Sequence, residues 1–341
     1  MFIRSKAPLR IGLAGGGSDV SPFSDLYGGA ILNATINMYA YATIEPRSDG
    51  KIVLNAVDKG EYYMLESTEH LAIDGELDLI KGIYNRVVKD FAHKALTFTL
   101  TTYVDAPPGS GLGTSSTLVT AILGAFAEWL NLPLGEYDLA HLAYEIERVD
   151  LDMAGGKQDQ YAATFGGVNF MEFYKEDKVI VNPLRIKPQI LNELAYNMVL
   201  YYTGTSRVSA QIIEAQRQNV KSKNEQSIEA MHNIKQQATT MKEALLKGEL
   251  HKIGEILDYG WQQKKKMADN ITNSAIDELY TKVLAAGANG GKISGAGGGG
   301  FMIFYCPGNT RHQVIKMLEQ NGGQVKRYEF VTTGLQTWTM G

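Results

Sequence analysis

Residues 107–116 have the sequence PPGSGLGTSS, in which glycines stand just before three hydroxyl side chains. The segment before them, residues 97–104, alternates and is rich in β-branched residues, which predicts a strand. The apolar run 117–130 is too long for a strand and predicts a buried helix. At such a junction, backbone N–H groups and hydroxyls can bind phosphate or a phosphate-bound magnesium ion. The alternative is an ordinary glycine turn with a serine cap at a helix start.

Two better-known glycine motifs are excluded. The loop is not a Walker A motif, because no Lys-Ser/Thr pair follows its last glycine. A second glycine segment, residues 290–300, contains the pattern Gly-x-Gly-x-x-Gly at Gly295, Gly297 and Gly300. A dinucleotide site requires a helix after this pattern, whereas the apolar run 301–305 predicts a strand. The segment instead indicates backbone packed closely against a ligand or another loop.

Arg10 stands in an otherwise apolar segment that predicts a strand running into the glycine turn 15–17, which Asp19 follows. Because an unpaired buried charge is costly, Arg10 needs an anionic partner. An anionic substrate and an internal salt bridge satisfy this need equally well.

Acidic side chains form a further group. Glu145 and Glu147 lie near the end of a helix expected over 137–150, and Asp159 follows the glycine pair at 155–156. Carboxylates in such positions can supply a magnesium ligand and a general base. A solvated helix face and a helix cap are the alternative.

The composition limits the classes of function. The chain has 341 residues and a net charge of −4, which gives no indication of bulk electrostatic binding to nucleic acid. Its one cysteine, Cys306, follows an apolar run and is expected to be a buried thiol. The six histidines lack metal-ligand spacing. No segment reaches the length of a membrane span, and the N-terminus lacks a signal-peptide pattern. We expect a cytoplasmic protein with no membrane partner.

The elements that position these residues fall into two domains. Pro183 and Pro188 interrupt regular structure, so we expect domains at 1–185 and 186–341. In the first domain, strands are also expected over 30–45 and 51–57. For the second domain we predict two or three amphipathic helices within 207–266, broken at Gly248, a helix over 274–287, strands over 292–294 and 301–305, a helix over 310–321 and a strand over 325–331.

Three segments in order resemble the motifs of the galactokinase–homoserine kinase–mevalonate kinase–phosphomevalonate kinase (GHMP) superfamily. They are residues 7–10 (APLR), 107–115 (PPGSGLGTS, with Thr114 where serine is usual) and 292–300 (KISGAGGGG). Together they span nearly the whole chain. The resemblance implies an α+β fold of two domains, the first resembling ribosomal protein S5 domain 2 and the second ferredoxin-like, with ATP and Mg²⁺ bound between them.

The resemblance also implies residue roles. Ser115 and Glu147 match the magnesium-binding positions, and Asp159 matches the aspartate proposed as catalytic base in galactokinase-like members. Arg10 takes the place of a catalytic basic residue near the transferred phosphate, and Asp19 matches an acid that contacts sugar hydroxyls. The expected ATP-binding residues are those of the glycine loop: Pro107, Gly109, Ser110, Gly111, Leu112, Gly113, Thr114, Ser115 and Ser116.

Within the superfamily, residues 7–19, 29–36 and 155–161 are most similar to the kinases of D-glycero-D-manno-heptose 7-phosphate. This likeness implies transfer of phosphate from ATP to the anomeric C1 hydroxyl, which gives the 1,7-bisphosphate for nucleotide-heptose and surface glycan synthesis. The galactokinase sequence Gly-Glu-His-Thr-Asp is replaced here by residues 15–19 (GGGSD), which argues against galactose. Another sugar 1-kinase, such as a fucokinase, and an inactive sugar-phosphate-binding relative remain as alternatives, and a homodimer is compatible with the family.

A sugar that already carries a phosphate needs a cationic pocket. Arg207 follows a glycine turn at an expected helix start and is the first choice for it, while Lys157 and Lys6 are weaker choices. The sequence does not distinguish an Arg207 that binds the sugar phosphate from an Arg207 that is an ordinary charge on a helix surface. The expected substrate-binding residues are Gly16, Gly17, Ser18, Asp19, Lys157, Arg207, Gly297 and Gly298.

Overall fold

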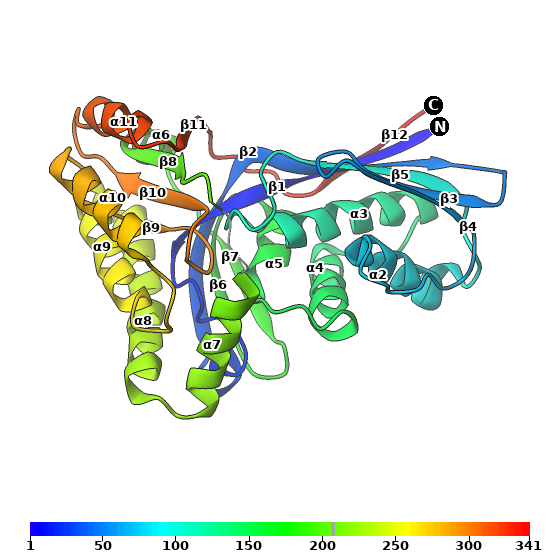
Figure 1. Ribbon diagram of the computed structural model, residues 1–341, viewed down its shortest axis with the longest axis horizontal. Coiled ribbons are helices and arrows are strands. Elements are labelled where there is room, and N and C mark those ends of the chain that lie inside the picture. Colours follow the sequence, from blue (N-terminus) through cyan, green and yellow to red (C-terminus); the bar gives the residue numbers. More distant parts are fainter. Residues whose placement is uncertain (206–208) are drawn as a thin grey trace.

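The computed structural model describes residues 1–205 and 209–341, which form two sheets joined side by side (Figure 1). The larger sheet is built mainly from the first half of the chain, with one strand from residues 336–340, and the smaller one is built from the second half. The two-domain α+β architecture expected from the sequence is confirmed. In the described residues, no helix is both long and apolar enough to cross a membrane.

The larger sheet is mostly antiparallel and has eight strands. Its main path runs β12-β1-β2-β5-β3-β4, while β6 pairs with the far end of β2 and with β7. Among the strands described for this sheet, β3 and β5 are the one pair of parallel neighbours. The strands are β1 (Phe2–Ala14), β2 (Gly29–Pro46), β3 (Lys51–Ala56), β4 (Glu61–Glu66), β5 (Phe98–Val104), β6 (Val168–Phe173), β7 (Val179–Pro183) and β12 (Gln336–Met340).

Strands β1 and β2 are long enough to reach from one end of the molecule to the second domain (Figure 1). Their pairing contains register shifts between Pro8 and Arg10 and between Gly12 and Ala14. Such irregularities bend a strand and redirect its side chains. Arg10 therefore lies at a bend of β1 close to where the two domains meet.

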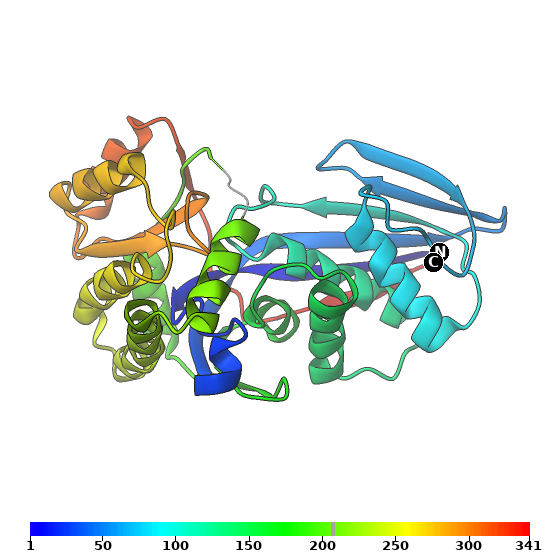
Figure 2. The same ribbon diagram turned by 60° about the horizontal axis from the view of Figure 1, so that its bottom comes forward.

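Helices cover one face of the larger sheet (Figure 2). The central helix α3 (Thr114–Leu130) is buried along most of its length because its sequence is apolar on all sides. It begins directly after the glycine loop. Around it lie α2 (Asp78–Val87), α4 (Glu136–Glu145) and α5 (Gln158–Phe165), and α2 and α4 continue into single π-helical turns at Val88–Ala92 and Ile146–Asp150.

The second sheet is antiparallel, in the order β11-β8-β10-β9. Its strands are β8 (Met198–Tyr202), β9 (Gly290–Ile293), β10 (Phe301–Tyr305) and β11 (Gln324–Lys326), and β10 is fully buried. The helices of the described chain not yet named are α1 (Phe23–Tyr27), α6 (Pro188–Asn197), α7 (Ser209–Lys221), α8 (Glu225–Lys247), the short 3₁₀ turn Leu250–Lys252, α9 (Ile253–Lys264), α10 (Ser274–Ala285) and α11 (Arg311–Glu319).

Most expected elements are present with small changes of boundary, and Cys306 is buried as predicted. Two expectations need correction. The strand expected over 325–331 is only Gln324–Lys326, after which the chain leaves the second sheet. It then returns to the first sheet, where β12 pairs with β1, so the last residues lie with the N-terminal domain although we grouped them with 186–341. The boundary near 185 stays a prediction.

Candidate active site

A pocket of about 210 Å³ lies where the two domains meet, and we call it the central pocket. It is lined by the glycine turn after β1, the loop before α3, the start of α5, the end of α9 and the residues around β9. Segments far apart in the sequence thus form one site. Several side chains singled out from the sequence line it: Arg10, Asp19, Thr114, Ser115, Ser116, Glu147 and Asp159.

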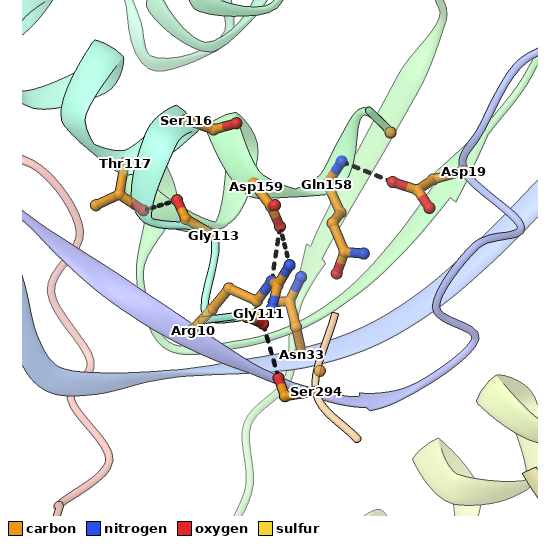
Figure 3. Close-up of polar contacts among 12 residues, drawn as sticks. Arg10, Asp19, Asn33, Gly111, Gly113, Ser116, Thr117, Gln158, Asp159 and Ser294 are labelled. Carbon is orange, nitrogen blue, oxygen red and sulfur yellow. Dashed lines mark hydrogen bonds and ion pairs between the residues drawn. The ribbon is translucent and has the colours of Figure 1, made fainter. Parts of the chain in front are cut away.

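The glycine loop is shaped by contact with the second domain. Gly111 has φ +87°, and a Cβ added there would lie 2.1 Å from the backbone oxygen of Ser294. The Ser294 hydroxyl donates to the carbonyl of Gly111 at 3.0 Å (Figure 3). Only glycine fits this position, because both the backbone conformation and the space exclude a side chain. The close packing of one glycine segment on another loop, expected from the sequence, is therefore present.

Not every residue of the loop faces the pocket. Gly109, Gly111, Gly113 and the three hydroxyl residues line it, whereas Pro107, Ser110 and Leu112 do not. Ser110 and Leu112 are fully buried. Their carbonyls accept from the N–H groups of Phe301, at 2.8 Å, and Arg10, at 3.2 Å. These two residues hold the loop in place rather than presenting side chains to a ligand.

Arg10 and Asp159, which both line the pocket, form a close ion pair (Figure 3). The Nε and Nη2 atoms of Arg10 both lie 2.6 Å from Oδ1 of Asp159, and Nη1 donates to the carbonyl of Gly111 at 2.6 Å. Arg10 is almost fully buried, while the Asp159 side chain is 21% exposed toward the pocket. The structure thus supplies the internal partner that Arg10 requires and leaves the carboxylate accessible to a ligand.

Ser115 and Glu147 bring hard oxygen atoms together beside the loop. The Ser115 hydroxyl donates to Oε1 of Glu147 at 3.0 Å, and Gln160 donates to Oε2. Glu147 is fully buried, and Nη1 of Arg148 lies 3.5 Å from its Oε1. A hydroxyl and a carboxylate suit Mg²⁺, which takes one or two protein oxygens and completes its shell with water and phosphate. Across the described ranges, no cluster of three or more acidic, histidine or cysteine side chains could hold a metal by itself.

Asp19 is fully buried at the end of the glycine turn and accepts three backbone hydrogen bonds. Oδ2 accepts from the N–H groups of Lys157, at 2.8 Å, and Gln158, at 3.1 Å, and Oδ1 accepts from Gly17 at 3.3 Å. Burial, and then the charge of Asp159, raise the pKa of Asp19. The carboxylate therefore faces the pocket from a position fixed by the start of α5.

Two expected substrate-binding side chains turn away from the central pocket. The hydroxyl of Ser18 donates to the carbonyls of Gly15 and Ala30 and accepts from the N–H of Ala30, so it stabilises the turn. The ammonium of Lys157 lies 2.7 Å from Asp177 and 3.0 Å from Asp25. Two carboxylates already neutralise it, so only its backbone N–H reaches the site.

The remaining expectations concern the second domain and Lys6. Gly297 and Gly298 pack against Ile271 and do not line the pocket; their neighbours Gly295 and Ala296 do. The ammonium of Lys6 lies over the ring of Tyr39, away from the pocket. Arg207 lies outside the described residues.

Sequence reasoning missed two buried lysines of the second domain, Lys264 at the end of α9 and Lys292 on β9. Both line the pocket, and their ammonium groups donate to the carbonyls of Gly16, at 3.2 Å, and Gly12, at 2.9 Å. Lys292 stood within a recognised motif without an assigned role. Lys264 is the first of three consecutive lysines in an amphipathic segment, where no sequence signal separates it from its neighbours.

Comparison with known proteins identifies the family. The GHMP kinases N terminal domain matches residues 78–167, and the GHMP kinases C terminal family matches residues 241–324. The first match contains the glycine loop, Glu147 and Asp159, and the second contains Lys264 and Lys292. The two matches thus cover part of the pocket lining on each side, while Arg10, the glycine turn and Asp19 lie before the first matched segment.

Relatives extend over the whole chain. The chain is 50% identical over 336 residues, 98% of each protein, to D-glycero-alpha-D-manno-heptose 7-phosphate kinase of Campylobacter jejuni. It is 49% identical to a crystal structure of a D-glycero-D-manno-heptose 1-phosphate kinase from Bacteroides thetaiotaomicron, with a TM-score of 0.85 and 99% of each chain covered. It is 27% identical to the L-fucokinase/L-fucose-1-P guanylyltransferase of Bacteroides fragilis, over 94% of this chain but 36% of that one. The two family segments, the relative that is 50% identical and the matching fold agree. The chain therefore belongs to the GHMP kinases and is a phosphotransferase.

Proposed function

We propose that this protein transfers the γ-phosphoryl group of ATP to the anomeric C1 hydroxyl of D-glycero-D-manno-heptose 7-phosphate, giving the 1,7-bisphosphate. The observation that carries the proposal is the Arg10–Asp159 pair, which lies beside the glycine loop and is accessible from the pocket. The relative that is 50% identical is named for this substrate. The product would supply nucleotide-heptose synthesis for surface glycans.

Asp159 is the proposed general base. Its carboxylate takes the proton of the C1 hydroxyl as the C1 oxygen forms a bond to the γ-phosphorus. The bond from the γ-phosphorus to the β–γ bridging oxygen breaks, and ADP leaves with that electron pair. Arg10 holds the carboxylate through two nitrogens, and its charge offsets the negative charge that develops on the phosphoryl group.

The glycine loop and the start of α3 are the proposed triphosphate site. Backbone N–H groups at a helix N-terminus favour phosphate, and Ser115 and Ser116 add hydroxyls at the same place. Ser115 and Glu147 would hold Mg²⁺, which when bound offsets charge on the β- and γ-phosphates. Glu147 is kept in position for this by Gln160.

The glycine turn and Asp19 form the proposed sugar side of the pocket. Gly16 leaves space there, because a Cβ added to it would meet no atom closer than 3.8 Å, and the Asp19 carboxylate can accept hydrogen bonds from sugar hydroxyls. Gly17 also lines the pocket, but Cε of Met267 takes the place that its Cβ would need. A Cβ at Gly156 would lie 1.9 Å from Oδ2 of Asp19, so glycine is required for the carboxylate to reach the start of α5.

A kinetic panel tests the proposal. Heptose 7-phosphate, heptose 1-phosphate, fucose and galactose are each supplied with ATP and Mg²⁺, and ADP release is measured. We expect kcat/KM for heptose 7-phosphate to exceed the others at least hundredfold. Faster turnover of fucose would favour the fucokinase alternative, heptose 1-phosphate as the preferred acceptor would place the reaction at another hydroxyl, and no turnover of any sugar would favour an inactive binding relative.

A further inference from the structure

Lys264 and Lys292 are buried lysines to which the reaction proposed above assigns no role. The two residues are 4% and 5% exposed, and both line the central pocket. Each ammonium donates to one backbone carbonyl, that of Gly16 or Gly12. Among the described residues, no carboxylate oxygen lies within 4.0 Å of either ammonium. Burying an ammonium group without an opposite charge in contact is costly and lowers the pKa of both lysines, and an anion bound between them would offset that cost.

The two lysines converge on the same short stretch of backbone. A Cβ added to Gly16 would lie 3.8 Å from the ammonium of Lys264 and 4.0 Å from that of Lys292. Arg10 is a further basic side chain nearby: burial, then Lys264 and then Arg10 lower the pKa of Lys292, and a bound anion would favour its charged form. Three basic side chains therefore stand close together, while Asp159 is already held by Arg10 and Asp19 by three backbone N–H groups.

The two lysines contact a different part of the pocket from the start of α3. The proposed triphosphate site lies at the start of α3, where Ser115 and Glu147 meet. The lysines lie instead at the turn 12–16, on the path from Arg10 to Asp19, and Lys264 is close enough to Asp19 for the two charges to interact. A sugar with its reacting hydroxyl at Asp159 and other hydroxyls at Asp19 would place a distal phosphate on this side of the pocket.

We propose that Lys264 and Lys292 together bind the phosphate group that the sugar substrate already carries. The inference rests on the proposed function in requiring a phosphorylated acceptor, but not on the identity of that sugar. Two ammonium groups fixed by glycine carbonyls provide charged donors to one phosphate, and they come from the second domain while Asp159 comes from the first. The phosphate therefore links the two domains when the acceptor is bound.

The test compares each sugar phosphate with its unphosphorylated counterpart. Wild type, Lys264→Met and Lys292→Met are assayed with heptose 7-phosphate and heptose, and with mannose 6-phosphate and mannose. The discrimination ratio is kcat/KM for the phosphorylated sugar divided by that for its counterpart. Loss of one charged hydrogen bond should lower this ratio about tenfold to hundredfold in each variant, with KM for ATP within threefold of wild type.

Lys265→Met is the matched control. Lys265 is the next residue along the chain, but its side chain is 28% exposed and lies 3.8 Å from Asp277. Its ratio should stay at the wild-type value. Lys264→Arg and Lys292→Arg keep the charge and should recover part of the discrimination. If a methionine variant does not fold, the glutamine variant, which keeps a donor to the glycine carbonyl, takes its place in the same comparison.

The outcomes separate this inference from the proposed function. If wild type prefers another phosphorylated sugar and the variants lose that preference, the heptose assignment fails and the lysine assignment stands. An equal loss on phosphorylated and unphosphorylated sugars, or a large rise in KM for ATP, would assign the lysines to the transferred phosphoryl group or to the fold and overturn the inference. A wild type with no preference for any phosphorylated sugar would also overturn it.

Discussion

Replacing Asp159 with asparagine removes the proposed base while keeping its shape. Proton removal by a positioned base contributes about 10²- to 10⁴-fold to rate, so kcat should fall by that factor, equivalent to about 3–5 kcal/mol of activation free energy. The glycine loop, Ser115 and Glu147 are unchanged in the variant. Affinity for a non-hydrolysable ATP analogue should therefore stay within threefold of wild type.

The same substitution leaves the buried guanidinium of Arg10 without a carboxylate partner. Removing one member of a buried ion pair costs about 3–5 kcal/mol. Here the Asp159 side chain is 21% exposed and Arg10 keeps its bond to the Gly111 carbonyl, so a smaller loss of about 2–3 kcal/mol is expected. Adding Arg10→Met removes the unpaired charge, so the double variant should regain part of the stability but none of the turnover.

Two measurements check this reasoning. Single-turnover rates are compared at a temperature where each variant is folded by circular dichroism, and calorimetry gives the affinity for the ATP analogue. If Asp159→Asn keeps turnover within tenfold of wild type, Asp159 is not the base. If Asp159→Asn loses turnover and ATP affinity together, Asp159 acts through the fold of the nucleotide site instead.

Three further predictions follow from the geometry. Glu147→Gln should raise the Mg²⁺ concentration for half-maximal activity at least tenfold, measured by magnesium titration, and an unchanged requirement would remove Glu147 as a metal ligand. Gly111→Ala should lower the free energy of unfolding by about 2–4 kcal/mol in denaturant titration, because its Cβ would meet the carbonyl of Ser294. The control is Gly50→Ala, where φ is +77° and the space is open, and its free energy of unfolding should fall by about 1 kcal/mol. Burial lowers the pKa of Lys264 to about 8. Because the cationic form of Lys264 binds phosphate, KM for the sugar phosphate should rise as pH increases above about 8. A KM that does not change between pH 7 and 9.5 would contradict this.

Local patterns in the sequence predicted the parts of the site that local structure creates. The glycine loop, the strand before it and the helix after it follow from glycine, β-branched and apolar residues that are neighbours in the chain. The need of Arg10 for an anionic partner was also visible. Its partner was not fixed by the residues alone, because Asp159 lies 149 positions further along the chain and only the fold brings them together.

Side chains whose roles depend on long-range packing could not be assigned from the sequence. Lys264 and Lys265 are adjacent in the sequence, yet one is buried at the pocket and the other lies toward solvent. Ser18 had the right type and place for a sugar contact, but Ala30 takes up its hydrogen bonds. The pairing of β12 with β1 joins the two ends of the chain and carries no local signal.

The central claim concerns which sugar accepts the phosphate and at which hydroxyl. The most direct measurement is ³¹P and ¹H nuclear magnetic resonance of the product formed from ATP and D-glycero-D-manno-heptose 7-phosphate. The account predicts two phosphomonoester signals of equal intensity, one coupled to the anomeric proton and one to the C7 protons. A new phosphate on any carbon other than C1, or no new phosphomonoester with active enzyme present, would contradict it.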